Sequence, residues 1–199
     1  QNGVNAITIK DGDEVIEAKP TTGNSEVLIA AKDGKAIRFN EQAVRPIGRT
    51  GAGVKGITIE DGDEVIGMVC VEPDTKEDIL VVSENGYGKR TDLDDYRITN
   101  RGGKGVKTLQ ITEKTGKLIA IKSVTDANDL MIINQSGIVI RLAVSECRVM
   151  GRATQGVRLI NLAKKNDVIA SVCKVMSSEL EASVEEESKA AWAKKSEEI

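Results

Sequence analysis

The sequence predicts an all-β fold in which small sheets repeat along the chain, as in propeller-type proteins. Gly-Val pairs recur roughly fifty residues apart, with their valines at Val4, Val54, Val106 and Val157. Short runs rich in Val, Ile and Leu, bounded by Gly, Asn and Asp, lie inside each period and are typical of β-strands. Strands with a period of this length are typical of blades that pack on one another. We therefore expect a propeller-like array of four-stranded blades, open or partial.

A turn near the start of each period joins the first pair of expected strands. Residues 7–16 recur as residues 57–66 with a single change, and both copies contain Asp-Gly. The third and fourth copies keep the surrounding apolar residues but carry Thr115-Gly116 and Asn166-Asp167 at the turn. Gly, Asn and Asp tolerate the positive φ that two-residue hairpin turns require.

The remaining strands follow from β-branched runs and a second recurring turn. In the second period we expect four strands, over residues 56–60, 65–71, 78–83 and 87–91. A second hairpin turn with Gly in third place recurs at residues 32–35, 84–87 and 135–138. Aromatic residues make up only 2% of the chain, so the cores must consist of aliphatic side chains and each blade needs neighbours to bury its faces.

The chain divides into repeats and a tail. The repeats are expected at about residues 1–50, 51–102 and 103–153, with a partial one over 154–176. Residues 177–199 form an acidic tail with seven acidic residues against three lysines, which we expect to be disordered or a marginal helix. Because closed propellers have about 4–8 blades, the repeats are expected to form an open arc or part of a larger array.

Composition excludes several classes of function. The sequence has no His and no Cys-x-x-Cys, so we expect no metal site, no cofactor and no catalytic centre. The acidic tetrads 11–14 and 61–64 are interpreted as turns, because they lack the ligand spacing of a calcium loop. Cys70, Cys147 and Cys173 are expected to be buried thiols. No apolar run of transmembrane length and no signal peptide is visible, so a cytoplasmic location is expected.

Cations recur in register with the Gly-Val pairs. The first register lies five residues before each valine and holds Arg49, Arg101 and Arg152. The second lies at the end of the fourth expected strand and holds Arg38, Arg90 and Arg141. The third directly follows the valines and holds Lys55, Lys107 and Arg158. Lys89 and Lys104, which neighbour these registers, complete the candidate binding set.

Core packing does not require cations at equivalent points of every blade. A curved row of them, flanked by glycines that let a polyanion approach the backbone, favours binding to phosphate groups without base readout. The alternative is that the arginines pair with recurring acids such as Glu41, Asp94 or Glu146, as salt bridges on or between blades.

The residues around these arginines resemble a known family. The Gly-Arg-x-x-x-Gly-Val repeats, residues 45–49, residues 85–91 and above all Asn100-Arg101-Gly102-Gly103-Lys104-Gly105 are similar to the DNA gyrase A C-terminal domain, over nearly all of residues 1–175. The resemblance implies a β-pinwheel, in which neighbouring blades exchange strands and a basic rim wraps duplex DNA. It also implies a non-catalytic domain of an ATP-dependent type IIA topoisomerase, with the remainder of the gyrase A protein and the gyrase B protein as partners at the nucleoid.

The resemblance leaves alternatives open. The family's seven-residue box, Gln-Arg-Arg-Gly-Gly-Lys/Arg-Gly, differs here at its first two positions, Thr99 and Asn100. The true box therefore lies upstream of Gln1, or a box-like loop is retained in a later blade. The C-terminal domain of topoisomerase IV is a related alternative. A protein-binding propeller is a further one, disfavoured by the scarcity of aromatic residues.

Overall fold

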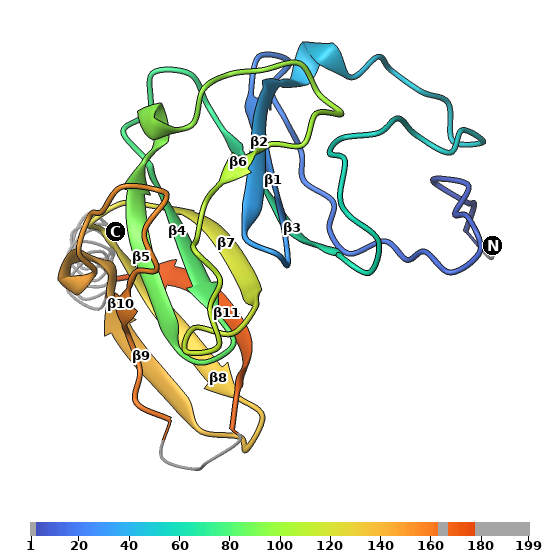
Figure 1. Ribbon diagram of the computed structural model, residues 1–199. Coiled ribbons are helices and arrows are strands. Elements are labelled where there is room, and N and C mark those ends of the chain that lie inside the picture. The colour runs from blue at the N-terminus through green and yellow to red at the C-terminus, as the bar shows by residue number, and fades with distance from the viewer. Residues whose placement is uncertain (1–2, 163–166, 178–199) are drawn as a thin grey trace, which may run out of the picture.

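The computed structural model describes residues 3–162 and 167–177, and this part of the chain forms three antiparallel sheets (Figure 1). Sheet A has the strand order β3-β1-β2-β6, sheet B the order β10-β5-β4-β7 and sheet C the order β11-β8-β9. The strands of sheet A are β1 (Glu26–Ala31), β2 (Lys35–Asn40), β3 (Val65–Val71) and β6 (Val106–Lys107). Those of sheet B are β4 (Asp78–Ser83), β5 (Tyr87–Asp92), β7 (Leu118–Val124) and β10 (Val157–Arg158). Those of sheet C are β8 (Asn128–Asn134), β9 (Val139–Ala143) and β11 (Ile169–Met176).

Each sheet combines strands from successive repeats. In sheet A, the hairpin β1-β2 belongs to the first period, β3 to the second and β6 to the third. Sheet B repeats this arrangement one period later, with β7 and β10 as the exchanged strands. The all-β prediction and the strand exchange implied by the family resemblance are both confirmed.

The strand expected over residues 56–60 is absent. This segment instead lies beside the loop that precedes β6, where the Thr58 amide donates to the Gly103 carbonyl at 2.8 Å. The chain also forms no strand over residues 7–16. Residues 3–22 and 44–64 run as long loops beside sheet A, in blue and cyan at the right of Figure 1. The Gly-Val pairs have a different role, because Val106 and Val157 begin the exchanged strands β6 and β10.

The predicted turns at residues 32–35, 84–87 and 135–138 join the paired strands of the three hairpins. Gly34 and Gly86 have φ of +82° and +79°, which disfavours any side chain. A Cβ at Gly34 would also lie 2.5 Å from the Leu109 carbonyl oxygen, and one at Gly86 2.8 Å from that of Ile160. The tips of the first two hairpins therefore pack tightly on segments from two periods later.

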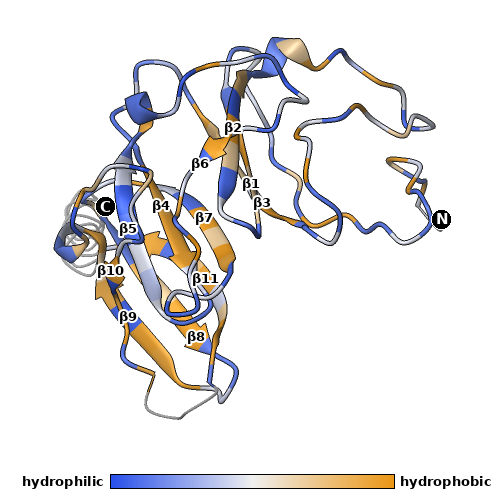
Figure 2. Cartoon of the chain, viewed as in Figure 1, coloured by the Kyte–Doolittle hydropathy of each residue, from blue (hydrophilic) through white to orange (hydrophobic). Residues whose placement is uncertain are grey.

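The sheets pack through cores on both faces of sheet B. Strand β4 has four successive apolar residues, and all four are fully buried. Because strand side chains alternate between faces, Ile79 and Val81 pack in the core shared with sheet A, while Leu80 and Val82 pack in the core shared with sheet C. Figure 2 shows this apolar band along the central strands. Burial on two faces explains why this run does not alternate in sequence.

Short 3₁₀ helices follow each hairpin. They are η1 (Glu41–Ala43), η2 (Leu93–Asp95) and η3 (Val144–Glu146). The residue after η2, Tyr96, is buried, and its hydroxyl hydrogen-bonds with that of Thr108. Burial outweighs this bond and raises the pKa of Tyr96 to about 12. The residue after η3, Cys147, is likewise buried.

The three cysteines differ in their exposure. The expected burial of the thiols is wrong for Cys173, which is exposed, and only partly right for Cys70, which is half-buried. The acidic tail lies outside the described residues apart from Ser177, whose amide donates to the Ala127 carbonyl at 2.9 Å. Within the described residues, no helix is long and apolar enough to span a bilayer, and no group of acidic or Cys side chains could hold a metal ion.

Candidate nucleic-acid interface

Two loops of the same design lie on neighbouring sheets. We call residues 100–105 the first loop and residues 151–156 the second loop. The first ends at Gly105, where a Cβ would lie 2.5 Å from the Ala36 carbonyl oxygen of β2. The second ends at Gly156, where a Cβ would lie 2.6 Å from the Gly88 carbonyl oxygen of β5. Glycine is therefore required at the point where each loop enters its exchanged strand.

Each loop has one arginine that is oriented by two backbone carbonyls. Arg101 Nε donates to the Ala43 carbonyl at 2.8 Å and its Nη1 to the Lys55 carbonyl at 3.0 Å. Arg152 Nε donates to the Asp95 carbonyl at 3.0 Å and its Nη1 to the Lys107 carbonyl at 2.9 Å.

The acceptors are equivalent in the two loops. Ala43 and Asp95 end η1 and η2, while Lys55 and Lys107 follow the valines of their own periods. Within the described chain neither arginine's Nη2 donates a hydrogen bond, so each guanidinium is held in place with one edge available to a ligand.

Because these arginines bind the carbonyls of Lys55 and Lys107, the first and third registers meet at each loop. Lys55, Lys107 and Lys104 are exposed, and in the part of the chain that the structure describes their side chains form no ion pair or hydrogen bond. We define a cation unit as a loop arginine with the lysine whose carbonyl it binds. Arg49 is exposed in the equivalent loop of the preceding period, and its guanidinium has no hydrogen-bond partner among the described residues.

Two of the three arginines in the second register, Arg38 and Arg90, are buried. Arg38 is 8% exposed, its Nε donates to Glu26 at 2.6 Å, and its Nη1 donates to the carbonyls of Leu93 and Tyr96. It thereby ties sheet A to the segment that follows β5 of sheet B. Its main acidic partner is therefore Glu26 in β1. Asp94, which the salt-bridge alternative named, is exposed, and its carboxylate lies 3.9 Å from Arg38 Nη1.

Arg90 repeats this arrangement one sheet later. Its Nη2 donates to Asp78 at 2.7 Å, its Nη1 to Asp126 at 2.6 Å and to the Val144 carbonyl at 3.1 Å. Burial opposes its charge, but the hydrogen bonds to Asp126 and Asp78 outweigh burial and raise the pKa of Arg90. Arg141 Nε likewise donates to Asp129 at 2.7 Å. Salt bridges therefore describe the second register better than phosphate contact does, but the main acidic partners are Glu26, Asp78 and Asp129 rather than the acids suggested from the sequence.

Two further members of the candidate set make internal contacts. Lys89 is fully buried, and its ammonium group donates to carbonyls of the second loop. Arg158 Nη2 donates to the Tyr87 hydroxyl at 3.0 Å, and its guanidinium lies 5.4 Å from the centre of that ring. Arg158 is exposed, so its guanidinium can still reach a ligand while it contacts Tyr87.

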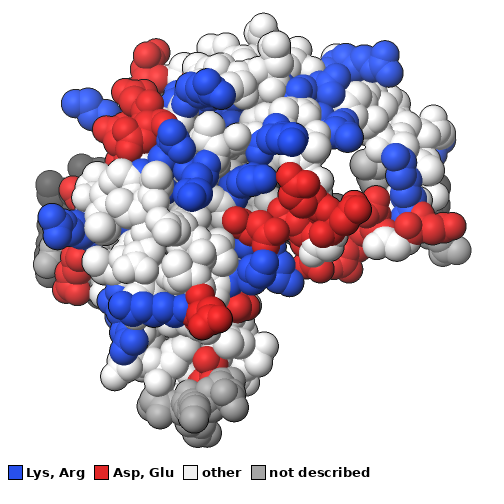
Figure 3. Space-filling view, in the orientation of Figure 1, with Lys and Arg blue, Asp and Glu red and all other residues white. Residues whose placement is uncertain are grey.

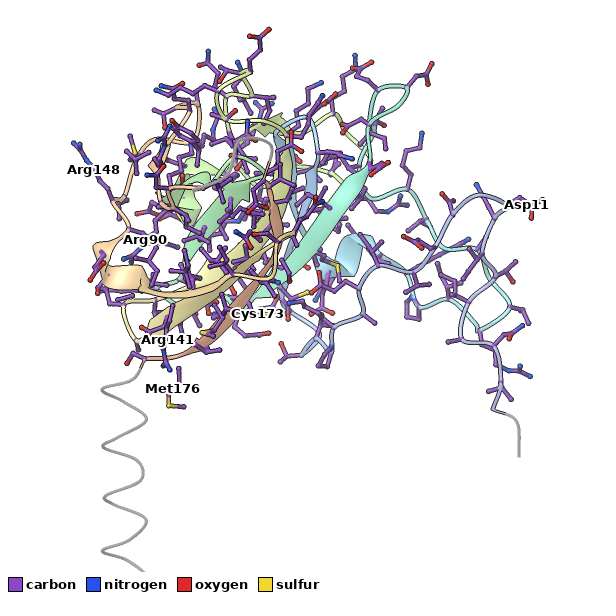
Figure 4. The ribbon with its side chains drawn as sticks, turned by 90° about the horizontal axis from the view of Figure 1, so that it is seen from below. Asp11, Arg90, Arg141, Arg148, Cys173 and Met176 are labelled. Atoms are coloured by element: carbon purple, nitrogen blue, oxygen red, sulfur yellow. The ribbon has the colours of Figure 1, made fainter. Side chains whose placement is uncertain are left out.

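A fourth register was missed at the sequence level. It lies four residues before the first register and holds Arg45, Arg97 and Arg148. All three are exposed, and their side chains have no hydrogen-bond or ion-pair partner within residues 3–162 and 167–177. In Figure 4, Arg148 projects away from the body of the molecule, whereas Arg90 lies among other side chains. Equal spacing alone could have revealed this register.

Acidic residues gather at the hairpin tips. Lys35 pairs with Glu60 at 3.5 Å, Lys32 with Glu64 at 3.2 Å, and Lys117 with Asp33. The first two contacts join the turn at residues 60–64 to the tip of the β1-β2 hairpin. Figure 3 shows that acidic and basic residues are separated on this side of the molecule, with a block of Asp and Glu next to a face where Lys and Arg gather. The positive charge is therefore local, although the whole chain has a net charge of −3.

Exchanged strands and repeated cationic loops define a β-pinwheel with basic loops. The family model described as "DNA gyrase C-terminal domain, beta-propeller" matches residues 1–22, 25–72, 77–125 and 128–173. The chain belongs to the family of DNA gyrase A C-terminal domains.

Curated relatives agree with this assignment. The chain is 45% identical over 188 residues to the A subunit of DNA gyrase from Staphylococcus aureus (strain MRSA252), a match that covers 94% of this chain and 21% of that protein. It is 43% identical over 175 residues to the corresponding gyrase protein of Staphylococcus epidermidis, covering 88% of this chain and 20% of that protein. The chain thus spans about a fifth of the length of these relatives.

Solved structures share the fold. A structure titled "Structure of DNA gyrase A C-terminal domain" has a TM-score of 0.79 and 27% identity, over 87% of this chain and 58% of that one. The C-terminal domain of DNA topoisomerase IV has a TM-score of 0.80 and 24% identity, over 92% of this chain and 57% of that one. The second likeness shows the fold alone.

Proposed function

We propose that this chain binds duplex DNA through its phosphate backbone, without sequence preference, and helps to bend or wrap it. The domain has no catalytic role of its own. It supports negative supercoiling by a type IIA topoisomerase in the cytoplasm, together with the rest of the gyrase A protein and with the gyrase B protein. Its DNA contacts come from successive repeats, with boundaries near residues 50, 102 and 153.

The observation that carries this proposal is the repeated cation unit. Arg101 with Lys55 and Arg152 with Lys107 have the same hydrogen-bond geometry on successive sheets. A guanidinium fixed by two carbonyls loses little freedom when its remaining edge binds a phosphate oxygen. Repetition on successive sheets suits a ligand that itself repeats, as a nucleic-acid backbone does.

The proposed interface differs from the set predicted from sequence, because four residues leave it and the three arginines of the fourth register join it. We include the first, third and fourth registers with Lys104, and we leave out the buried Arg38, Arg90 and Lys89 and the paired Arg141. Bending 20–30 bp by 40–90° costs roughly 1–6 kcal/mol, so several phosphate contacts along a curved path must offset that cost.

The test is binding to linear duplex DNA of about 150 bp, roughly one persistence length, across a salt series. Replacing Arg49, Arg101 and Arg152 with Ala should weaken binding to all sequences alike. Each lost phosphate contact should lower the slope of log K against log salt by about 0.9. Lys76→Ala is the matched control, because Lys76 is exposed, lies outside the loops and has no side-chain hydrogen bond or ion pair among the described residues.

An unchanged slope in the triple variant, with binding intact, would assign these arginines to structure and overturn the proposed interface. A supercoiling assay on the parent enzyme then separates the gyrase role from that of topoisomerase IV. Loss of negative supercoiling with retained relaxation is the result expected for gyrase.

A further inference from the structure

Lys89 has the least exposed ammonium-bearing side chain in the described chain, with an exposure of 0%. Its Nζ donates to the Gly151 carbonyl at 2.8 Å, the Thr154 carbonyl at 3.0 Å and the Thr154 hydroxyl at 3.1 Å. It also donates to the carbonyl of Arg152, the arginine of the second cation unit. Four acceptors thus surround three N–H groups, all within the second loop.

The equivalent residue in sheet A is not charged. Ile37 occupies this position in β2, where it pairs with Ile29 as Lys89 pairs with Val81 in sheet B. Ile37 is 2% exposed, and its Cδ1 lies 3.5 Å from where a Cβ at Gly103 would be. The first loop therefore rests on an apolar side chain, and the second loop rests on an ammonium group.

Few charges face this ammonium group. Arg152 in the second loop repels it, and Asp95 at the end of η2 attracts it. Tyr96, which follows η2, is neutral because burial raises its pKa to about 12. Burial, assisted by Arg152 and opposed by Asp95, lowers the pKa of Lys89 to about 8.

When Lys89 loses its proton, it can no longer donate to all of its hydrogen-bond acceptors. A neutral amine has two N–H groups for the four acceptors of the second loop, and they are weaker donors than those of an ammonium group. The Gly151 carbonyl also accepts from the Thr154 amide, and the Thr154 carbonyl from the Gln110 amide, whereas Lys89 is the one donor to the Arg152 carbonyl among the described residues. An acceptor left without its donor is costly, so we expect the loop to loosen at Arg152. The first loop on Ile37 has no equivalent dependence.

We propose that Lys89 is a positioning residue, whose buried ammonium holds the second loop in the shape that presents Arg152, and that this loop alone loosens when Lys89 loses its proton. The proposal rests on the DNA-binding function for its consequence, which is that one of two neighbouring phosphate contacts depends on pH. Lys89 itself contacts no DNA.

The first test is DNA affinity and salt slope at pH 7.0 and pH 9.5, for the unchanged chain, Lys89→Met, Lys89→Arg and Ile37→Met. In the unchanged chain, affinity should fall about fivefold at the higher pH and the slope by about 0.9, the contribution of one phosphate contact. Lys89→Met should bind weakly at both pH values. Lys89→Arg stays charged throughout and should bind with little pH dependence. Ile37→Met should follow the unchanged chain.

The second test needs no DNA. In NMR titrations, the Lys89 side chain and the amides of residues 151–154 should shift together with a midpoint near pH 8, while the amides of residues 100–105 stay constant. Shared midpoints without DNA binding at any pH would support the positioning role and refute the proposed function. DNA binding with the same pH profile in the unchanged chain and Lys89→Met, or a Lys89 midpoint near its ordinary value, would overturn the positioning role.

Discussion

The first and second loops present an arginine in the same geometry, but different residues support the two loops from below. Arg101 and Arg152 each bind the carbonyl that ends a 3₁₀ helix and the carbonyl that follows a recurring valine. Beneath them, Ile37 supports one loop by apolar contact and Lys89 supports the other by hydrogen bonds. The repeat thus preserves the arginine that is presented, while the residue that supports the loop beneath it varies.

An arginine follows the supporting residue in both strands, Arg38 after Ile37 and Arg90 after Lys89. Removing either arginine should change the stability of the fold more than any other substitution considered. Arg38→Ala and Arg90→Ala should each lower the free energy of unfolding by about 3 kcal/mol, because each leaves a partly buried carboxylate and carbonyl acceptors without their donor. Urea denaturation measures this. Arg148→Ala, which removes an exposed and unpaired arginine among the described residues, is the control and should change stability little.

A loss below about 1 kcal/mol in both variants, the size of an exposed ion pair, would mean that the second register is not a structural tie between blades. Unequal losses would show that the two sheets differ in more than the residue beneath each loop.

Substitutions at the glycine where each loop joins its exchanged strand should have an intermediate effect on stability. Gly105 and Gly156 have φ of +70° and +75°, and an added Cβ would meet a backbone oxygen in both cases. Gly105→Ala and Gly156→Ala should each cost about 1–3 kcal/mol from backbone strain, with a further loss from the displaced strand. Thermal or urea unfolding of the two variants provides the comparison.

Gly53→Ala is the matched control for this pair. Gly53 precedes a recurring valine and has φ of +81°, but no atom lies within 4 Å of its added Cβ. It should therefore show the strain without the collision. If all three variants lose the same stability, the close approach of loop and strand contributes nothing.

The sequence predicted strands well where burial is local. The expected strands 65–71, 78–83 and 87–91 coincide with β3, β4 and β5, within one residue at the end of β5, because their apolar runs are bounded by turn residues. The expected strand 56–60 failed because its partner lies in a loop more than forty residues away. Exchange between repeats is a long-range pairing, and it was implied by the family resemblance rather than by any local pattern.

The residues of the candidate site were predicted only in part, because their burial also depends on contacts that are distant in the sequence. Regular spacing identified the arginines of the loops, but it does not distinguish an exposed register from a buried one. Arg38 and Arg90 recur because each donates to a carbonyl of the 3₁₀ helix that follows the next hairpin and so ties its sheet to the next one. Lys89 lies in a strand whose first five residues are buried, so its charge faces the interior. Tertiary packing decided these roles, and no local pattern in the sequence measures it directly.

The smallest effect is a pH dependence of global stability that distinguishes Lys89, which titrates, from Ile37, which does not. The pKa of Lys89 is lowered to about 8 in the folded chain and is about 10.4 in the unfolded chain, so the unfolded state binds more protons between these values. Lys89 should therefore contribute a rise in stability of about 1 kcal/mol from pH 8 to pH 9. This rise is measured as the difference between the unchanged chain and Lys89→Met, because burial raises the pKa of Cys70 and Cys147 and these thiols oppose the rise in the same pH range. Lys89→Met should remove this rise, and Ile37→Met should keep it.

Tyr96 sets the upper end of that window. Its raised pKa means that the folded chain binds more protons than the unfolded chain between about pH 10 and 12, so stability should fall there. Measurements by urea denaturation between pH 7.5 and 9.5 avoid this opposing effect. Within that range the contribution of Lys89 to global stability rises while its hold on the second loop weakens, and a buried ammonium that served only the stability of the fold would not show both changes.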